Sequence, residues 1–328
     1  MAGLSAQGRA KAAATPRPVA SALMVLVGAA LFGTVGTAQA LGPEVPAESL
    51  AAARMLTTGA LLVLFAVAAR QAPAVLTAAR QAPAWFAGLG QGGFNLCFLA
   101  AMKEAGVAVG TLVAIGATPV VTGLVTRHVT RRWALATTVA VAGLAVLVLG
   151  QQGTPTAASP WGVVLALGAA ASYATYIVAG NAAEARGLET QSFLAAAFSV
   201  AAMVTLPWLL LGDLGWVASR DGALLLGYLV LVPTILAYSF FNRGLRGVRS
   251  SAASTLALVE PVVAASLAVT VLGEQLSPVG LLGVGMVLLG LLLIVRSAAA
   301  HDAGAGSRGG PGSARDGAAF DVPIRPVG

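Results

Sequence analysis

The chain has 328 residues, of which 58% are hydrophobic and 9% are charged, and its mean hydropathy is +0.87. Soluble domains carry about 25% charged residues, so this composition excludes an ordinary soluble protein and predicts a membrane protein with spans of about 20 residues. The net charge of +7 does not predict nucleic-acid binding, because the basic residues form no continuous patch.

Metal and thiol chemistry have few residues to draw on. The single cysteine, Cys97, excludes an intramolecular disulfide and a thiolate cluster, and His128 and His301 belong to a short basic loop and to the tail. We therefore expect no metal and no cofactor. A membrane enzyme would need a group of His, Cys or paired acids at depth in the membrane, and only one acid, Glu260, lies there, so we do not expect an enzyme.

Apolar runs bounded by polar residues, Pro or Gly predict ten membrane spans. Because lipid offers no hydrogen bonds, each span must satisfy its own backbone groups and should be a helix. The predicted spans cover residues 19–41, 50–69, 84–102, 107–126, 133–150, 161–180, 191–211, 222–242, 252–272 and 278–296.

The first span resembles a secretory signal peptide. It follows Arg9, Lys11 and Arg17 and ends at AQA, residues 38–40, which resembles a cleavage site. Its apolar stretch is longer than the roughly 7–15 residues of a signal-peptide core. We therefore interpret it as a span that the protein retains.

The basic residues alternate between the two sides of the membrane. With the N-terminus inside, sixteen of the 19 Lys and Arg residues lie in cytoplasmic segments, Lys103 and Arg220 lie outside, and Arg54 lies within the second span. Because positive residues stay on the cytoplasmic side, both termini are predicted to be cytoplasmic, in a bacterial inner (plasma) membrane. Segments 1–18 and 297–328 are predicted to be disordered tails.

Several polar side chains lie inside the spans. Arg54 lies about 6 Å below the outer boundary, and we interpret it as snorkelling to that surface. Gln91 and Asn95 in the third span are four residues apart and share a helix face. A shift of 143 residues takes them to Thr234 and Tyr238 in the eighth span, so both halves have a polar face at the same place.

Polar side chains in a membrane are costly and tend to line cavities or contact partners. Thr111 and Ser254 match at the same shift, and Tyr173 and Tyr176 form a polar aromatic face on the sixth span. The alternative is that such side chains only hold helices together, at about 0.6 kcal/mol each, which we favour for Ser and Thr alone. The predicted substrate cavity comprises Gln91, Asn95, Thr111, Tyr173, Tyr176, Tyr238 and Ser254.

Glu260 lies near the centre of the ninth span, where an ionised carboxylate costs at least about 2.5–3.5 kcal/mol. It should be protonated, paired or in a wet cavity, and Arg54, about 12 Å away along the membrane normal, is too far for a direct pair. Pro261 removes a backbone hydrogen bond from the ninth span, and Pro119 is its counterpart in the fourth span. The two prolines predict a hinge or kink in both spans. Glu260 either bonds the freed backbone groups, which we favour, or couples protons or binds a substrate amine.

The chain consists of two related halves. AMKEAGVAVGTLVAIGATPVV (101–121) aligns with GLRGVRSSAASTLALVEPVV (244–263) when one gap is allowed. Five spans per half is an odd number, so the second half must cross the membrane in the opposite sense. We predict an all-α integral membrane fold of two inverted five-helix repeats, residues 19–150 and 161–296, which implies alternating access.

The second half carries a set of family motifs. They are the small-residue start of the ninth span, Glu260-Pro261, the LGEQLSPVGLLG turn with Glu274, and Gly283 and Gly290 seven residues apart. With AAARML (51–56) in the second span, they make the chain resemble the EamA family of the ten-span drug/metabolite transporter superfamily over about residues 19–296. The first half departs from the family pattern at Thr118, where the second half has Glu260.

This resemblance implies a secondary active transporter. Members of the family mostly export amino acids and related metabolites, and some export drugs or import. We expect an exporter of small amino acids or related metabolites, with proton exchange as the candidate driving force; a hydrophobic drug exporter and a passive channel are the alternatives. The expected partners are a small-molecule substrate and the lipid bilayer, with no nucleic acid, and assembly as a homodimer is left open.

Overall fold

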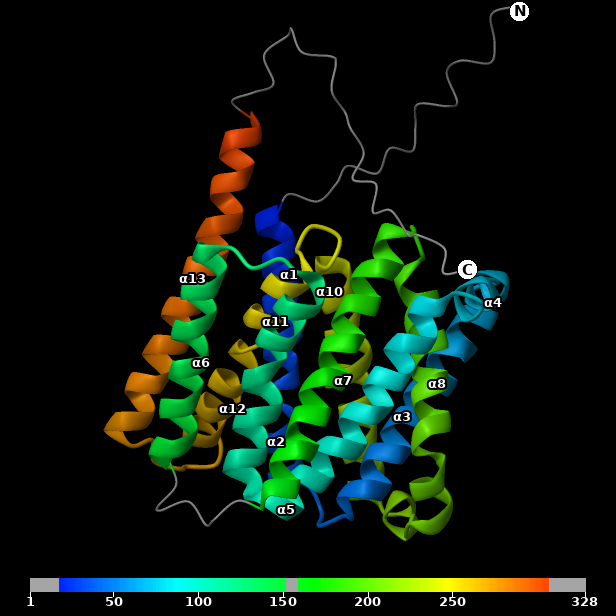
Figure 1. Ribbon diagram of the computed structural model, residues 1–328. Helices are drawn as coiled ribbons and strands as arrows, with labels where there is room; N and C mark the ends of the chain where they lie inside the picture. Colours follow the sequence, from blue (N-terminus) through cyan, green and yellow to red (C-terminus); the bar gives the residue numbers. More distant parts are fainter. Residues whose placement is uncertain (1–17, 152–158, 307–328) are drawn as a thin grey trace, which may run out of the picture.

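A computed structural model describes residues 18–151 and 159–306 (Figure 1), so most of each predicted tail lies outside the described residues. Within those residues all regular elements are helices, and nine are long and apolar enough to cross a membrane. The fold is that of a multi-pass membrane protein. The elements are α1 (Pro18–Phe32), α2 (Val35–Leu41), α3 (Ala47–Ala68), α4 (Ala72–Ala79), α5 (Ala82–Thr126), α6 (Arg131–Gln151), α7 (Pro160–Ala185), α8 (Thr190–Leu211), η2 (Gly215–Ala218), α9 (Arg220–Val230), η3 (Leu231–Leu236), α10 (Ala237–Gly244), α11 (Ser250–Leu256), α12 (Val259–Thr270) and α13 (Pro278–Gly306).

Each predicted span coincides with a helix or with an interrupted run of helices, and most ends agree within a few residues. Two differences stand out. The short helix α4 lies in a connection where no helix was predicted. Helix α13 continues to Gly306, past residue 297 where the sequence predicts a disordered tail, because the SAAA segment is rich in alanine, the best helix former.

Helix α5 is a hairpin of two arms, residues 82–105 and 107–126. Between them Gly106 has φ 79° and ψ 158°, a conformation that no α-helix contains. Figure 1 shows α5 running to one end of the bundle and then returning. The arms lie close together, since a Cβ on Gly110 would be 3.2 Å from the backbone nitrogen of Met102. The arms correspond to the third and fourth predicted spans.

Three other spans are interrupted near their middle. Helices α1 and α2 are separated at Gly33 and Thr34, the eighth span contains the π-helix η3, and α11 and α12 are separated just before Glu260. Two of these breaks touch, because a Cβ on Gly33 would be 2.6 Å from the backbone oxygen of Glu260. Close packing of a glycine thus holds the first span against the start of α12.

The two proline-containing spans differ in the backbone near the proline. The helix is interrupted just before Pro261, whereas the second arm of α5 keeps helical backbone angles through Pro119. The hydroxyl of Thr118 donates to the backbone oxygen of Ala114, 2.7 Å away, and such side-chain bonds stabilise a membrane helix around a proline. The backbone thus stays helical through Pro119, and a hinge or kink there stays a prediction.

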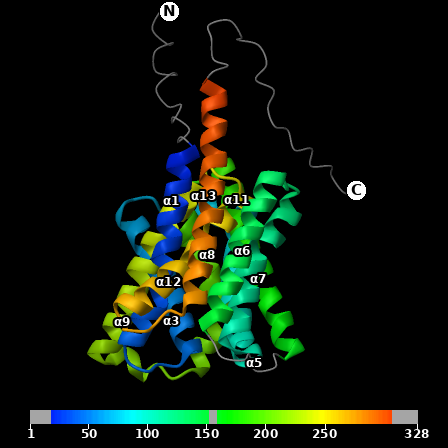
Figure 2. The same cartoon turned by 90° about the vertical axis from the view of Figure 1, so that its left-hand side faces the viewer.

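The helices pack in specific pairs, which run side by side in Figures 1 and 2. Helix α6 packs on α13, α3 on α8, α5 on α7 and α1 on α10. Glycine allows close approach, since a Cβ on Gly283 of α13 would be 2.3 Å from the backbone nitrogen of Leu147. The start of α1 and the end of α13 lie at the same end of the bundle, which we call the terminal end; the α2–α3 connection and the Gly106 bend lie at the distal end (Figures 1 and 2).

Candidate functional site

A central cavity of about 230 Å³ lies between the two halves of the chain. Helices α1 to α3 and both arms of α5 line it from the first half, and α7, η3, α10 and α12 line it from the second half. Aromatic rings, among them Phe32, Phe94 and Phe98, form much of its apolar wall. Its polar lining consists of Gln39, Arg54, Gln91, Asn95, Tyr173, Thr234, Tyr238 and Glu260.

The cavity runs from the middle of the bundle toward the distal end. Gln91, Tyr238 and Glu260 lie at its deep part, while Ala47 and Met102 line the part nearest the distal end. Lys103, the neighbour of Met102, pairs with Glu48, the neighbour of Ala47, so this ion pair between α3 and α5 lies next to the distal part of the lining. The cavity therefore extends toward the end of the bundle at which this ion pair lies.

A chain of hydrogen bonds orders the deep polar side chains. The Arg54 Nη2 group donates to Asn95 Oδ1 at 3.2 Å, and Asn95 Nδ2 donates to the backbone oxygen of Gln91 at 2.8 Å. The Tyr238 hydroxyl donates to Gln91 Oε1 at 2.9 Å. These bonds connect α3, the first arm of α5 and α10, so that an arginine from the first half and a tyrosine from the second half are held in one network.

Arg54 does not snorkel to the membrane surface as the sequence predicts. It points inward, lines the cavity and binds Asn95. Arg54 points inward because the Asn95 amide supplies a hydrogen-bond acceptor at the same depth in the bundle. A charge in a membrane favours such a partner over lipid. The guanidinium Nε is buried and has no hydrogen-bond partner among the described residues.

Glu260 faces the same cavity from the first turn of α12. Within the described residues its carboxylate forms neither an ion pair nor a hydrogen bond, and in particular it does not bond the backbone groups freed by Pro261. The favoured interpretation of Glu260 as a partner of the kink is therefore not what the structure contains. Arg54 and Glu260 line one cavity, although the sequence predicts a separation of about 12 Å along the membrane normal. They share the cavity because Arg54 turns inward and Glu260, after the interruption of the ninth span, also faces it.

Four of the seven predicted cavity residues, Gln91, Asn95, Tyr173 and Tyr238, line this cavity, and their part in transport stays a prediction. The Tyr173 hydroxyl is buried and has no partner among the described residues. Sequence reasoning left out Gln39, and it assigned Arg54 to the surface. The sequence feature that could have assigned Arg54 to the cavity is its positive charge within a membrane span.

The other three predicted residues, Thr111, Tyr176 and Ser254, are not part of this lining. Tyr176 is fully buried beneath the cavity, where its ring centre is 5.1 Å from that of Tyr238 and its hydroxyl accepts from Asn242. Ser254 is buried and donates to the backbone oxygen of Ser251. The structure therefore gives Tyr176 and Ser254 packing contacts within the bundle.

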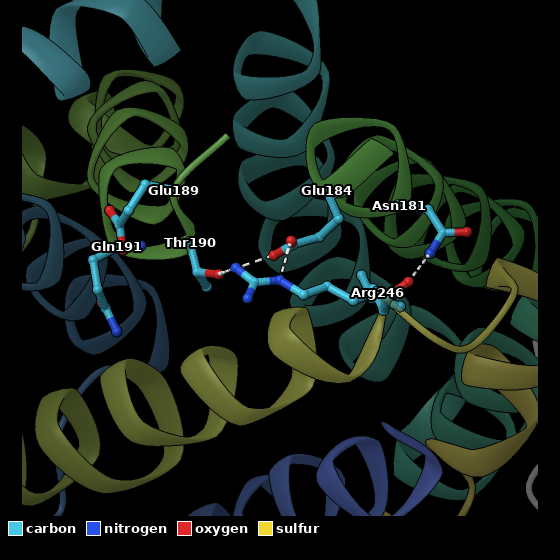
Figure 3. Close-up of polar contacts among 7 residues, drawn as sticks. Asn181, Glu184, Glu189, Thr190, Gln191 and Arg246 are labelled. Atoms are coloured by element: carbon cyan, nitrogen blue, oxygen red, sulfur yellow. Dashed lines mark hydrogen bonds and ion pairs between the residues drawn. The ribbon is translucent and has the colours of Figure 1, made fainter. Parts of the chain in front are cut away.

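A second polar cluster lies at the terminal end of the bundle, and Figure 3 shows its side chains. The Arg246 Nε group lies 2.6 Å from Glu184 Oε2 at the end of α7, and its Nη2 group donates to Thr190 Oγ1 at 3.0 Å. Thr190 donates in turn to Glu184 Oε1 at 2.9 Å. Asn181, one turn before the end of α7, donates to the backbone oxygen of Leu245 at 2.8 Å. We call these four side chains, Asn181, Glu184, Thr190 and Arg246, the Arg246 cluster.

No group of three or more His, Cys, Asp or Glu side chains in the described part of the chain could hold a metal ion. The site therefore consists of one arginine, one glutamate and neutral polar groups in an aromatic cavity. Such a site can bind a small polar molecule through charge and hydrogen bonds.

Comparison with known proteins identifies the family. The EamA-like transporter family matches residues 160–296. The chain is 35% identical over 289 residues to the uncharacterized transporter YwfM of Bacillus subtilis, across 83% of this chain and 92% of YwfM. The chain belongs to the EamA-like transporter family, and it is a membrane transporter.

Two further similarities agree with this assignment. The uncharacterized inner membrane transporter YedA of Escherichia coli is 29% identical over 156 residues, which cover 46% of this chain and 50% of YedA. A solved crystal structure superposes with a TM-score of 0.72 at 20% sequence identity, over 86% of this chain and 98% of that one. At this identity the second similarity concerns the fold alone.

Proposed function

We propose that the protein is a secondary active transporter that works by alternating access, with ten membrane spans in two inverted five-helix repeats. Counting the two arms of α5 separately raises the nine candidate spans of the described residues to ten. The packing pairs support the repeat. In a repeat of five spans, each contact should have a counterpart between the helices that lie five spans away. The α3–α8 and α6–α13 contacts are each their own counterpart, and the α1–α10 contact is the counterpart of the contact between the first arm of α5 and α7.

The proposed orientation has the terminal end in the cytoplasm of a bacterial cell and the distal end outside its inner membrane. The ion pairs support the alternation of sides, because Lys103–Glu48 joins two connections expected outside and Arg246–Glu184 joins two expected inside. In this orientation the cavity reaches toward the exterior, and the Arg246 cluster closes the cytoplasmic side.

One observation carries the proposed substrate class: opposite charges, Arg54 and Glu260, face a single cavity from the two halves of the chain without pairing with each other. A charge in a membrane needs a partner. A zwitterion supplies both partners at once, with its carboxylate on Arg54 and its ammonium group on Glu260. The substrate is therefore a small amino acid or a related metabolite.

The size of the cavity agrees with such a substrate. Its volume of about 230 Å³ corresponds to about eight water molecules at about 30 Å³ each. An amino acid of similar volume fits with its polar groups at the deep end and its side chain against Phe94 and Phe98.

The proposed direction is export, by exchange for protons. Glu260 is the group that could carry the proton, because it is the one acid that lines the cavity among the described residues. If the carboxylate binds either a proton or the ammonium group of the substrate, uptake of one releases the other, and the two fluxes are coupled.

Counterflow in proteoliposomes tests this function. Vesicles containing the purified protein are loaded with unlabelled L-amino acids and diluted into a trace of the same amino acids in labelled form. A carrier accumulates label transiently, whereas a passive channel gives no accumulation, and Arg54→Gln is expected to abolish the signal. No counterflow with any amino acid, together with accumulation of a hydrophobic cationic dye, would favour the drug exporter instead.

A further inference from the structure

Lys103 and Arg246 occupy equivalent positions in the two halves of the chain. They are 143 residues apart, the separation that also relates Asn95 to Tyr238. Lys103 lies just before the Gly106 bend at the distal end, and Arg246 lies just after α10 at the terminal end. The repeat therefore places one cation at each end of the cavity.

Each cation connects two parts of the bundle at its own end. Arg246 joins the α10–α11 connection to Glu184 at the end of α7 and to Thr190 at the start of α8. Lys103 joins the first arm of α5 to Glu48 in the first turn of α3. Both pairs are formed in this structure, one at each end of the bundle.

The Arg246 pair lies on the terminal side of the cavity. Between them are Tyr176, whose ring packs on the lining residue Tyr238, and Asn242, which is hydrogen bonded to Tyr176. Glu184 is two turns beyond Tyr176 on α7, and Arg246 is one turn beyond Asn242. Separating α7 from α10 to open this end would therefore break the Tyr176–Asn242 hydrogen bond and the Arg246–Glu184 ion pair together.

The two pairs differ in strength. The Glu184 side chain is 6% exposed and that of Arg246 is 45% exposed, whereas the Lys103 and Glu48 side chains are 65% and 29% exposed. Exposed pairs contribute little, and a pair with one buried partner and a second hydrogen bond, from Arg246 to Thr190, costs more to break. The terminal end is therefore held more firmly than the distal end, in agreement with a cavity that extends toward Lys103.

We propose that Arg246–Glu184 and Lys103–Glu48 are the two latches of the transport path, and that each is broken only when the cavity opens at its own end. This proposal rests on the alternating-access function proposed above. A contact made in one state alone sets the balance between two states. Loss of the Arg246 latch should therefore favour the state open at the terminal end, and loss of the Lys103 latch the state open at the distal end.

Single-cysteine labelling tests the two opposite shifts. Cys97 is the single cysteine of the chain, so Cys97→Ala provides a cysteine-free background. Leu245→Cys reports on the terminal end, where Leu245 is 3% exposed and packs against Gly180 of α7. Met102→Cys reports on the distal end. A membrane-impermeant maleimide is added to vesicles of either orientation, and the rate of labelling is measured without substrate.

Arg246→Gln is expected to accelerate labelling at position 245 by about fivefold or more and to slow labelling at position 102, a shift of the size usual for coupled sites. Lys103→Gln should do the reverse, with a smaller change. Glu184→Gln removes the same latch from its other side and should act like Arg246→Gln, while Arg246→Lys keeps the charge and should shift the labelling less.

Arg243→Gln is the matched control, because it removes an arginine from the same helix end that forms no ion pair among the described residues. It should leave both labelling rates unchanged. The proposal is overturned if Arg243→Gln reproduces the effect, if Arg246→Gln and Glu184→Gln leave position 245 protected, or if the Lys103 and Arg246 variants shift labelling in the same direction. Labelling needs no substrate, so a failure of counterflow would overturn the proposed transport function while leaving the latches to be judged on their own.

Discussion

Arg54 on α3 donates a hydrogen bond to Asn95 on the first arm of α5, with 3.2 Å between Nη2 and Oδ1. Asn95 is in turn held by the backbone oxygen of Gln91, so the amide oxygen is fixed in place for the guanidinium. The amide is a positioning group for the one cation of the cavity lining. It leaves the Nε group of Arg54 without a protein partner among the described residues.

Asn95→Ala should weaken substrate binding by about tenfold or more. A hydrogen bond to a charged group contributes about 1.5–3 kcal/mol, and about 1.4 kcal/mol corresponds to a factor of ten. The half-saturating substrate concentration in counterflow is the measurement. Thr77→Ala, which removes an exposed hydroxyl contact on α4, is the control and should behave as the wild type. If Asn95→Ala bound substrate with the affinity of the wild type, the Asn95 amide would not be needed to position Arg54.

Glu260→Gln should abolish transport driven by a pH gradient while part of the substrate exchange persists. The amide keeps the shape of the side chain but cannot take up and release a proton, so the coupling is lost before the binding. Gradient-driven flux and counterflow are measured on the same proteoliposomes. Glu274→Gln removes an exposed acid in the connection after α12 and should change neither flux. Gradient-driven transport at the wild-type rate in Glu260→Gln would eliminate the proton role.

Two tyrosines of the cavity should respond differently to loss of the hydroxyl. Tyr238→Phe leaves Gln91 Oε1 without its donor, and an unsatisfied buried acceptor costs about 1–3 kcal/mol. Tyr173→Phe removes a hydroxyl that has no partner among the described residues, so thermal stability in detergent should not fall. If the Tyr173 hydroxyl binds substrate, this variant loses affinity at unchanged stability; equal affinity would assign the hydroxyl no role in binding.

Gly283→Ala should destabilise the protein, because its Cβ would be 2.3 Å from the backbone nitrogen of Leu147 and α13 would be forced away from α6. Overpacking of this kind costs about 1–3 kcal/mol. Gly285→Ala lies two residues further along α13, where a Cβ meets nothing within 4 Å, and it should be neutral or slightly stabilising. Melting temperatures of the two variants are compared, and an equal decrease in both would contradict close α6–α13 packing.

The span boundaries could be predicted from the sequence because lipid imposes a simple rule: an apolar segment of sufficient length must be a helix. The prediction located the two arms of α5 on either side of Gly106, and it placed Gln91, Asn95, Tyr173 and Tyr238 on faces that line the cavity. These features follow from periodicity and from the distribution of polar residues along single helices.

The direction of Arg54, the unpaired carboxylate of Glu260 and the continuous helix at Pro119 could not be predicted in the same way. Each depends on a group distant in the sequence or on the local satisfaction of a backbone bond. Arg54 turns inward because Asn95 of another helix offers an acceptor, and Thr118 bonds the backbone of its own helix near Pro119.

The sequence by itself determined the class of protein, the helical fold and the approximate ends of its spans, because composition and hydropathy act locally along the chain. Only the tertiary structure decided which polar residues share one cavity and which close its two ends. The spans that contain α3, α5, α10 and α12 are each long and apolar enough to cross a membrane. Their packing turns Arg54 and Glu260 toward the same cavity, and it joins Arg246 to Glu184 at the terminal end.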